Sequence, residues 1–151
     1  MPSFSRQLEV KGDAATSWSV LTDVPRLVSW VSIVDDAKEL AHLERYTAVL
    51  LDRIGPFKLR ADLDITVSEV EAGRHIRVQA SGEDRQVASR IGIDATLDLT
   101  QSDGGATTVS VEGTYEVVGR VATLGAGMIK QKATKILDEF FGRAGAELGV
   151  V

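Results

Sequence analysis

The two histidines, His42 and His75, are the side chains of this sequence best suited to bind a metal ion or to move a proton near neutral pH. They lie far apart, in neither a His-x-His nor a His-Glu-x-x-His spacing, so a metal site would need distant carboxylates as further ligands. The chain has no cysteine, which excludes disulfides, thiolate ligands and a thiol nucleophile. No serine lies in a Gly-x-Ser-x-Gly turn. We therefore predict no metal site and no catalytic residue, with both histidines at the surface or rim.

Two groups of charged residues could still do chemistry. Asp84, Arg85 and Arg90 fall near a turn between two expected strands. They could form a polar gate or dock a partner, but a solvated hairpin end with a weak local ion pair is the simpler expectation. Asp52 has the same strand parity as Tyr46 and therefore falls on the covered face, where a carboxylate must reach water or find a cation. We expect Asp52 at an exposed strand end.

The segment Gly125-Ala126-Gly127 contains the Gly-x-Gly spacing found in dinucleotide-binding loops. No third glycine follows at the required spacing, and no strand follows to complete a βαβ unit, so nucleotide binding is not expected. Each glycine should cost about 1 kcal/mol relative to alanine inside a helix. We predict that both are low-profile positions, where the start of a helix meets a pocket or the sheet.

The composition limits the class of protein. A chain of 151 residues suits one domain, which we expect to span residues 1–151. A net charge of −5 argues against a nucleic-acid partner, which would need a basic face. The N-terminus lacks the pattern of a signal peptide and the apolar runs are too short to span a membrane, so we expect a soluble cytoplasmic protein.

The hydrophobic pattern changes period twice along the chain. Residues 3–11 alternate as a strand; Asp13 can cap a short helix, and Pro25 can begin a second. From about residue 38 a period of two continues for roughly eighty residues, with turn residues between the strands. Helical spacing then runs from Val121 to about Leu148. The order β-α-α-β6-α predicts an α+β domain in which a curved antiparallel sheet is covered by a long C-terminal helix.

Several positions on the covered face of this sheet are small. They are Ala48, Ala61, Ala80, Ala95 and Gly113. Small residues on a concave face can leave an apolar pocket for a lipophilic molecule, or they can let the helix approach closely in a filled core. The sequence leaves these two alternatives open.

The order of elements resembles the helix-grip fold of the START-like (SRPBCC) superfamily. Three motifs narrow the resemblance: Tyr46-x-Ala48 leading to Gly55-Pro56, Gly119-x-x-Ala122-x-x-Gly125, and Glu139-Phe140-Phe141. With these motifs the chain resembles the CoxG family, named for the CoxG subunit of carbon monoxide dehydrogenase. The chain has "WVSIVDDAKEL" where many members have Leu-Pro-Gly, and it is expected to lack the linker and apolar C-terminal tail of other members.

The resemblance implies a non-catalytic accessory role that helps bring a cytoplasmic molybdenum-containing dehydrogenase to the inner face of the membrane. An apolar pocket beside such an enzyme suits a non-covalently held isoprenoid quinone, menaquinone or ubiquinone, or a lipid. Two alternatives remain: a polyketide cyclase or aromatase using Asp52, His75 or the tyrosines, and a purely structural adaptor with a filled core. For the leading hypothesis, the predicted ligand-binding residues are Trp30, Tyr46, Leu50, Phe57, Leu63, Ile65, Ile91, Ile93, Val111, Tyr115, Met128 and Ile129.

Overall fold

Seven strands, three α-helices and one 3-10 helix make up the computed structural model, which describes residues 2–102 and 104–151. The order is the one that the hydrophobic pattern predicts, apart from the added 3-10 helix. The elements are β1 (Ser3–Val10), α1 (Ala14–Leu21), α2 (Val24–Ser29), β2 (Val34–Ala41), β3 (Arg45–Ile54), β4 (Phe57–Glu71), β5 (His75–Asp84), β6 (Ser89–Gln101), β7 (Thr107–Gly119), η1 (Arg120–Leu124) and α3 (Ala126–Leu148).

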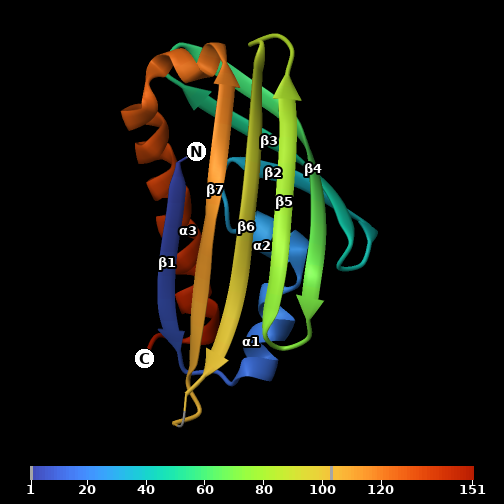
Figure 1. The fold of residues 1–151 in the computed structure, drawn as a ribbon, viewed down its shortest axis with the longest axis vertical. Helices are drawn as coiled ribbons and strands as arrows, with labels where there is room; N and C mark the ends of the chain where they lie inside the picture. Colours follow the sequence, from blue (N-terminus) through green and yellow to red (C-terminus); the bar gives the residue numbers. More distant parts are fainter. Residues whose placement is uncertain (1, 103) are drawn as a thin grey trace.

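The strands form one antiparallel sheet in the order β1-β7-β6-β5-β4-β3-β2. Along β4, Leu59, Ala61 and Leu63 are buried while the residues between them are exposed, so one face of the sheet is covered. Figure 1 shows α3 along the β1 edge, with β2 and β3 curving behind the other strands. The α+β class with a curved sheet and a C-terminal helix is thereby confirmed.

The two short helices begin where the sequence predicts. The Asp13 side chain accepts a hydrogen bond from the backbone N–H of Thr16 at 2.8 Å, which caps α1 and lowers the pKa of the Asp13 carboxyl. Asp23 caps α2 in the same way through the N–H of Arg26, and Pro25 lies in its first turn. These local signals fix the helices that close one end of the covered face.

The glycines before α3 have different structural roles. Residues 120–124 form a 3-10 helix, so α3 begins at Ala126 rather than at Val121. Gly125, the N-cap, has φ 96° and ψ 153°, a conformation almost restricted to glycine. No atom lies within 4 Å of a Cβ added at Gly125 or Gly127. The prediction that both lie where the helix meets a pocket or the sheet is wrong, because both are exposed and neither lines the cavity; the backbone conformation requires glycine at position 125.

The two halves of α3 differ in their contacts. The N-terminal half, residues 126–136, has no buried residue, although Ile129, Ala133 and Ile136 line the space between helix and sheet. This half stands off from the sheet and leaves a cavity. The buried residues of α3 all belong to its C-terminal half: Phe141, Ala144, Gly145 and Leu148.

Candidate ligand-binding cavity

A cavity of about 330 Å³ lies between the covered face of the sheet and the N-terminal half of α3. Its walls come mainly from β3, β6, β7 and α3, and α1 and α2 close one end. Nearly all of the wall is apolar. The volume is within the range of small-molecule sites, which begins at roughly 300 Å³. The small residues left open either an apolar pocket or a filled core, and the structure has the pocket.

Half of the twelve residues predicted to bind a ligand lie on this wall. Whether they bind one stays a prediction, but the fold brings them together around one space. They are Leu50, Ile91, Ile93, Val111, Tyr115 and Ile129. Of the five small residues that suggested free space, Ala95 lines the cavity, whereas Ala48 and Ala61 are buried in the core.

The cavity is only partly enclosed. Ile93 lies between Ile91 and Ala95 along the covered face, and all three line the cavity. Yet Ile93 is 38% exposed. Since Ile93 faces inward from a central strand, much of this exposed surface borders the space of the cavity.

Four of the predicted residues lie in the packed core instead. Trp30 is 2% exposed and its ring lies 5.6 Å from that of Phe140. The Tyr46 hydroxyl accepts a hydrogen bond from the Leu43 N–H at 2.7 Å, and burial raises the pKa of Tyr46. The remaining two are Leu63 and Ile65, which are buried on β4. They share the covered face with the cavity residues but lie elsewhere along it.

The last two predicted residues, Phe57 and Met128, are also absent from the wall. Phe57 is half-buried at the start of β4, with the Arg120 guanidinium 5.8 Å from its ring centroid. Met128 is 44% exposed, because it precedes the inward-facing Ile129 on the helix and points to another side.

A single ion pair interrupts the apolar wall. The Nζ of Lys132 on α3 lies 2.9 Å from Oδ2 and 3.1 Å from Oδ1 of Asp52 on β3, and both residues line the cavity. The Asp52 side chain is 9% exposed and that of Lys132 is 25% exposed. The expectation of an exposed strand end for Asp52 is wrong, because α3 covers that end of β3 and supplies the cation.

Sequence reasoning missed Lys132, but a signal for it existed. Lys132 follows Ile129 by three positions and precedes Ile136 by four, which places it on the same helix face as both. A lysine on that face must either reach water or meet a carboxylate, and Asp52 had already been assigned to the covered face. No such signal marked the cavity residues Leu21 of α1, Leu27 of α2 and Val31, which follows α2.

The Asp84 turn is also different from the expectation. Asp84 is 5% exposed and accepts hydrogen bonds from the backbone N–H groups of Arg60 at 2.7 Å, Gln86 at 2.9 Å and Val87 at 3.2 Å. The Arg60 N–H makes the largest contribution to lowering the pKa of this carboxyl. Asp84 therefore holds the turn together, and the solvated hairpin end predicted there is wrong.

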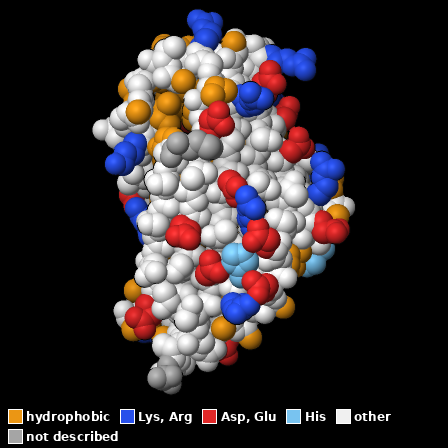
Figure 2. All heavy atoms as spheres, viewed as in Figure 1, with side chains coloured by type: hydrophobic (Ala, Val, Ile, Leu, Met, Phe, Trp, Pro, Cys, Tyr) orange, Lys and Arg blue, Asp and Glu red, His pale blue; other side chains and the backbone are white. Residues whose placement is uncertain are grey.

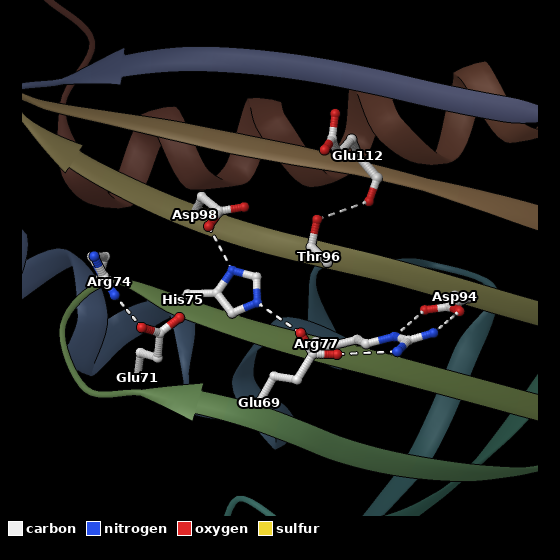
Figure 3. Close-up of polar contacts among 9 residues, drawn as sticks. All are labelled: Glu69, Glu71, Arg74, His75, Arg77, Asp94, Thr96, Asp98 and Glu112. Atoms are coloured by element: carbon white, nitrogen blue, oxygen red, sulfur yellow. Dashed lines mark hydrogen bonds and ion pairs between the residues drawn. The ribbon is translucent and has the colours of Figure 1, made fainter.

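His75 lies on the opposite face of the sheet from the cavity, since its neighbour Ile76 lines the cavity. Figure 3 shows it on β5, between Asp98 of β6 and Glu69 of β4 and turned away from α3. Its Nδ1 lies 2.5 Å from the Asp98 carboxylate, and this hydrogen bond raises the pKa of His75. Arg77 contacts Glu69 and Asp94 beside it.

This outer face carries mixed charges around the histidine, as Figure 2 shows. Among residues 2–102 and 104–151, no group of histidines and carboxylates is arranged to hold a metal ion. His75 faces away from the cavity, so the hypothesis that it acts there as an acid or base is wrong. Of that proposed set, Asp52 and Tyr115 line the cavity, whereas Tyr46 is buried in the core.

Comparison with known proteins identifies the family. Residues 7–148 match the family model of the carbon monoxide dehydrogenase CoxG subunit. The chain belongs to this family. The CoxG match spans both sides of the cavity, β3 as well as α3, so the cavity belongs to the family domain.

Solved structures place the CoxG chain in the START-like fold. A conserved protein from Geobacillus kaustophilus has a TM-score of 0.84 at 23% identity, with 97% of this chain and 95% of that chain covered. A START superfamily protein from Mycobacterium smegmatis has a TM-score of 0.71 at 15% identity, with 97% and 96% covered. At these identities the likeness establishes the fold. No curated protein is significantly similar in sequence.

Proposed function

We propose that this CoxG family protein is a non-catalytic carrier that holds an isoprenoid quinone or a lipid in its cavity and links a carbon monoxide dehydrogenase-type enzyme to the membrane. The observation that carries the proposal is the apolar cavity of about 330 Å³ beneath an unpacked half-helix. Burial of a lipophilic group there would gain about 25 cal/mol per Å² of apolar surface removed from water.

The size and opening of the cavity support a particular mode of binding. A volume near 330 Å³ suits a ring system with a short apolar extension rather than the whole of a long isoprenoid chain. Because the cavity is only partly enclosed, the remainder of such a chain has a way out. In this mode the head group occupies the cavity and the tail leaves through the opening.

The polar groups at the cavity support binding over catalysis. Acid–base catalysis needs a positioned donor or acceptor within hydrogen-bond reach of the reacting atom. At the cavity wall, Asp52 is engaged by Lys132, and Tyr115 stacks on Phe4 with ring centroids 6.5 Å apart. His75 is on the other face. A cyclase or aromatase activity therefore has little chemical support here.

The surface beside the cavity supports a membrane contact made through apolar residues. Met128 is large, apolar and 44% exposed, and it lies next to the cavity-lining Ile129 on α3. Figure 2 shows apolar side chains gathered at the upper left, where Figure 1 places η1 and the start of α3. A net charge of −5 gives no electrostatic attraction to anionic lipid, so the proposed membrane contact relies on these residues and the dehydrogenase partner. No helix in the described residues has the length and apolar character to cross a bilayer.

The proposal is tested by organic extraction of the purified protein and mass spectrometry for a stoichiometric isoprenoid quinone or lipid. The matched variants are Ala133→Phe, which fills the cavity, and Ala146→Phe, which places the same ring on an exposed position of the same helix. We expect bound lipophile in the wild type and in Ala146→Phe and at least a tenfold loss in Ala133→Phe. Stripped wild-type protein should regain thermal stability when menaquinone or ubiquinone with a short tail is added. Extraction of no lipophile, together with no stabilisation by either quinone or by phospholipid, would overturn the proposal.

A further inference from the structure

The Asp52–Lys132 pair has no evident reason to be in this wall on grounds of stability. Removing two charges from water is costly, and replacing a buried ion pair by apolar residues of similar size is often neutral or stabilising. Every neighbouring cavity residue on the same two elements is apolar: Leu50 and Ile54 on β3, and Ile129 and Ile136 on α3. A pair in such surroundings is the natural place for a ligand's polar group.

The pair is held so that it can offer a hydrogen bond. The Asp52 carboxylate is oriented by the backbone N–H of Arg53, which donates to Oδ1 at 2.8 Å, and Lys132 Nζ donates to the same oxygen at 3.1 Å. Oδ2 lies 2.9 Å from Nζ but accepts no hydrogen bond. Nζ carries three donors, and Asp52 is its only hydrogen-bond partner among the described residues. The ammonium therefore has spare donors for an oxygen atom in the cavity.

The charges of the pair restrict the kind of ligand oxygen that can accept this hydrogen bond. Asp52 and Lys132 together are neutral, so the pair can donate to a carbonyl or hydroxyl oxygen without attracting an anion. A carboxylate near Nζ would also lie near Asp52, and like charges in a poorly solvated site repel. The pair thus distinguishes neutral ligands from carboxylates by charge, and ligands with an oxygen acceptor from those without one by hydrogen bonding.

We propose that Asp52 and Lys132 are the specificity-determining pair of the cavity, with Lys132 donating to an uncharged ring carbonyl or hydroxyl and Asp52 excluding free carboxylates such as fatty acids. This inference rests on the proposed function, because it assumes that the cavity takes a lipophile. It narrows that lipophile to a neutral oxygenated ring. Asp52 also orients Lys132, so its own role is positioning and charge balance.

Three naphthalenes of nearly equal shape test this inference in the purified protein. They are 2-acetylnaphthalene, which has a neutral carbonyl, 2-isopropylnaphthalene, which has no acceptor, and 2-naphthoate, which is a carboxylate at neutral pH. Dissociation constants are measured by competition with a fluorescent lipophile. Since a hydrogen bond to a charged group is worth about one power of ten in affinity, we expect the ketone to bind roughly tenfold more tightly than the isopropyl compound and more tightly still than the carboxylate.

Three variants test the contributions of Asp52 and Lys132 to ligand preference. Lys132→Met should abolish the preference for ketone over isopropyl compound. Asp52→Asn should raise affinity for 2-naphthoate about tenfold, because it frees the lysine charge. The double variant Asp52→Leu/Lys132→Met removes both charges, guards against misfolding from an unpaired charge, and should bind the ketone and isopropyl compounds equally.

The outcomes are distinct from those of the extraction experiment. Equal binding of all three compounds by the wild type, or an unchanged preference in Lys132→Met, would overturn the role of the pair while leaving a lipophile-binding cavity intact. Preferential binding of 2-naphthoate by the wild type would overturn it as well and would favour a fatty acid. No binding of any of the three would overturn both this inference and the proposed function.

Discussion

The two halves of α3 have the same helical spacing of apolar residues but opposite relations to the sheet. Phe141, Ala144 and Leu148 are buried, whereas Ile129 and Ile136 remain partly exposed and line the cavity. Periodicity therefore predicts the direction in which a side chain points, but whether it meets another side chain or an empty space depends on the distance between helix and sheet. In this protein the packed half anchors the helix and the other half forms the site.

The largest expected effect on stability comes from truncating a side chain in the packed half of α3. Phe141→Ala should lower the free energy of unfolding by about 3–5 kcal/mol, because it opens a new void in the packed half. Ile129→Ala should cost about 1 kcal/mol or less, because its side chain already borders the cavity. Urea denaturation of both variants measures the difference. Equal losses would mean that the N-terminal half is as closely packed as the C-terminal half.

A smaller effect is expected at the start of the unpacked half. Gly125→Ala should lower the free energy of unfolding by about 1–3 kcal/mol, because alanine is strained at φ 96° and ψ 153°. Gly127→Ala should leave stability unchanged or raise it by up to about 1 kcal/mol, since the helix gains a better former and a Cβ there meets no other atom. Thermal and urea denaturation of the two variants provide the test. A loss in Gly127→Ala would reveal a packing role that the geometry does not support.

The smallest effect is expected away from α3, on the outer face. Asp98 raises the pKa of His75 in the folded protein, so the stabilisation from this pair is complete below the unfolded value of about 6.5 and is lost as pH rises through the folded value. The stability advantage of the wild type over His75→Gln should therefore shrink as the pH rises above about 6.5. His42→Gln, which alters a largely exposed histidine, is the control. An advantage that grows with pH would contradict the assignment, and affinity for a lipophile should not change in either variant.

Much of the fold could be predicted because its signals are local. Asp13 and Pro25 mark helix starts, alternation marks strands, and turn residues separate them. The family motifs then predicted the START-like arrangement. The boundary at η1 was missed because a 3-10 turn and an α-helical turn have similar apolar spacing over so few residues.

The site could be predicted only in part, for a geometric reason. A period of two assigns Tyr46, Leu50 and Ile65 to the same covered face, but it carries no information about where along the strand the helix diverges from the sheet. Leu50 therefore lies at the cavity and the other two in the core. Lys132 could have been found by placing the helix face opposite Asp52, which requires joining two distant segments.

The pairing of β1 with β7 has a consequence for how the cavity forms. Strands β2 to β7 are joined by successive hairpins, which pair residues close in sequence, whereas β1 must wait for the last strand and α3 comes after it. Contacts between distant segments form slowly because long loops must close first. On the ribosome, β7 and α3 also emerge after the other elements of this domain. We expect the apolar lining to stay open to water until β1 and α3 dock, so any molecule that the cavity holds arrives only after that step.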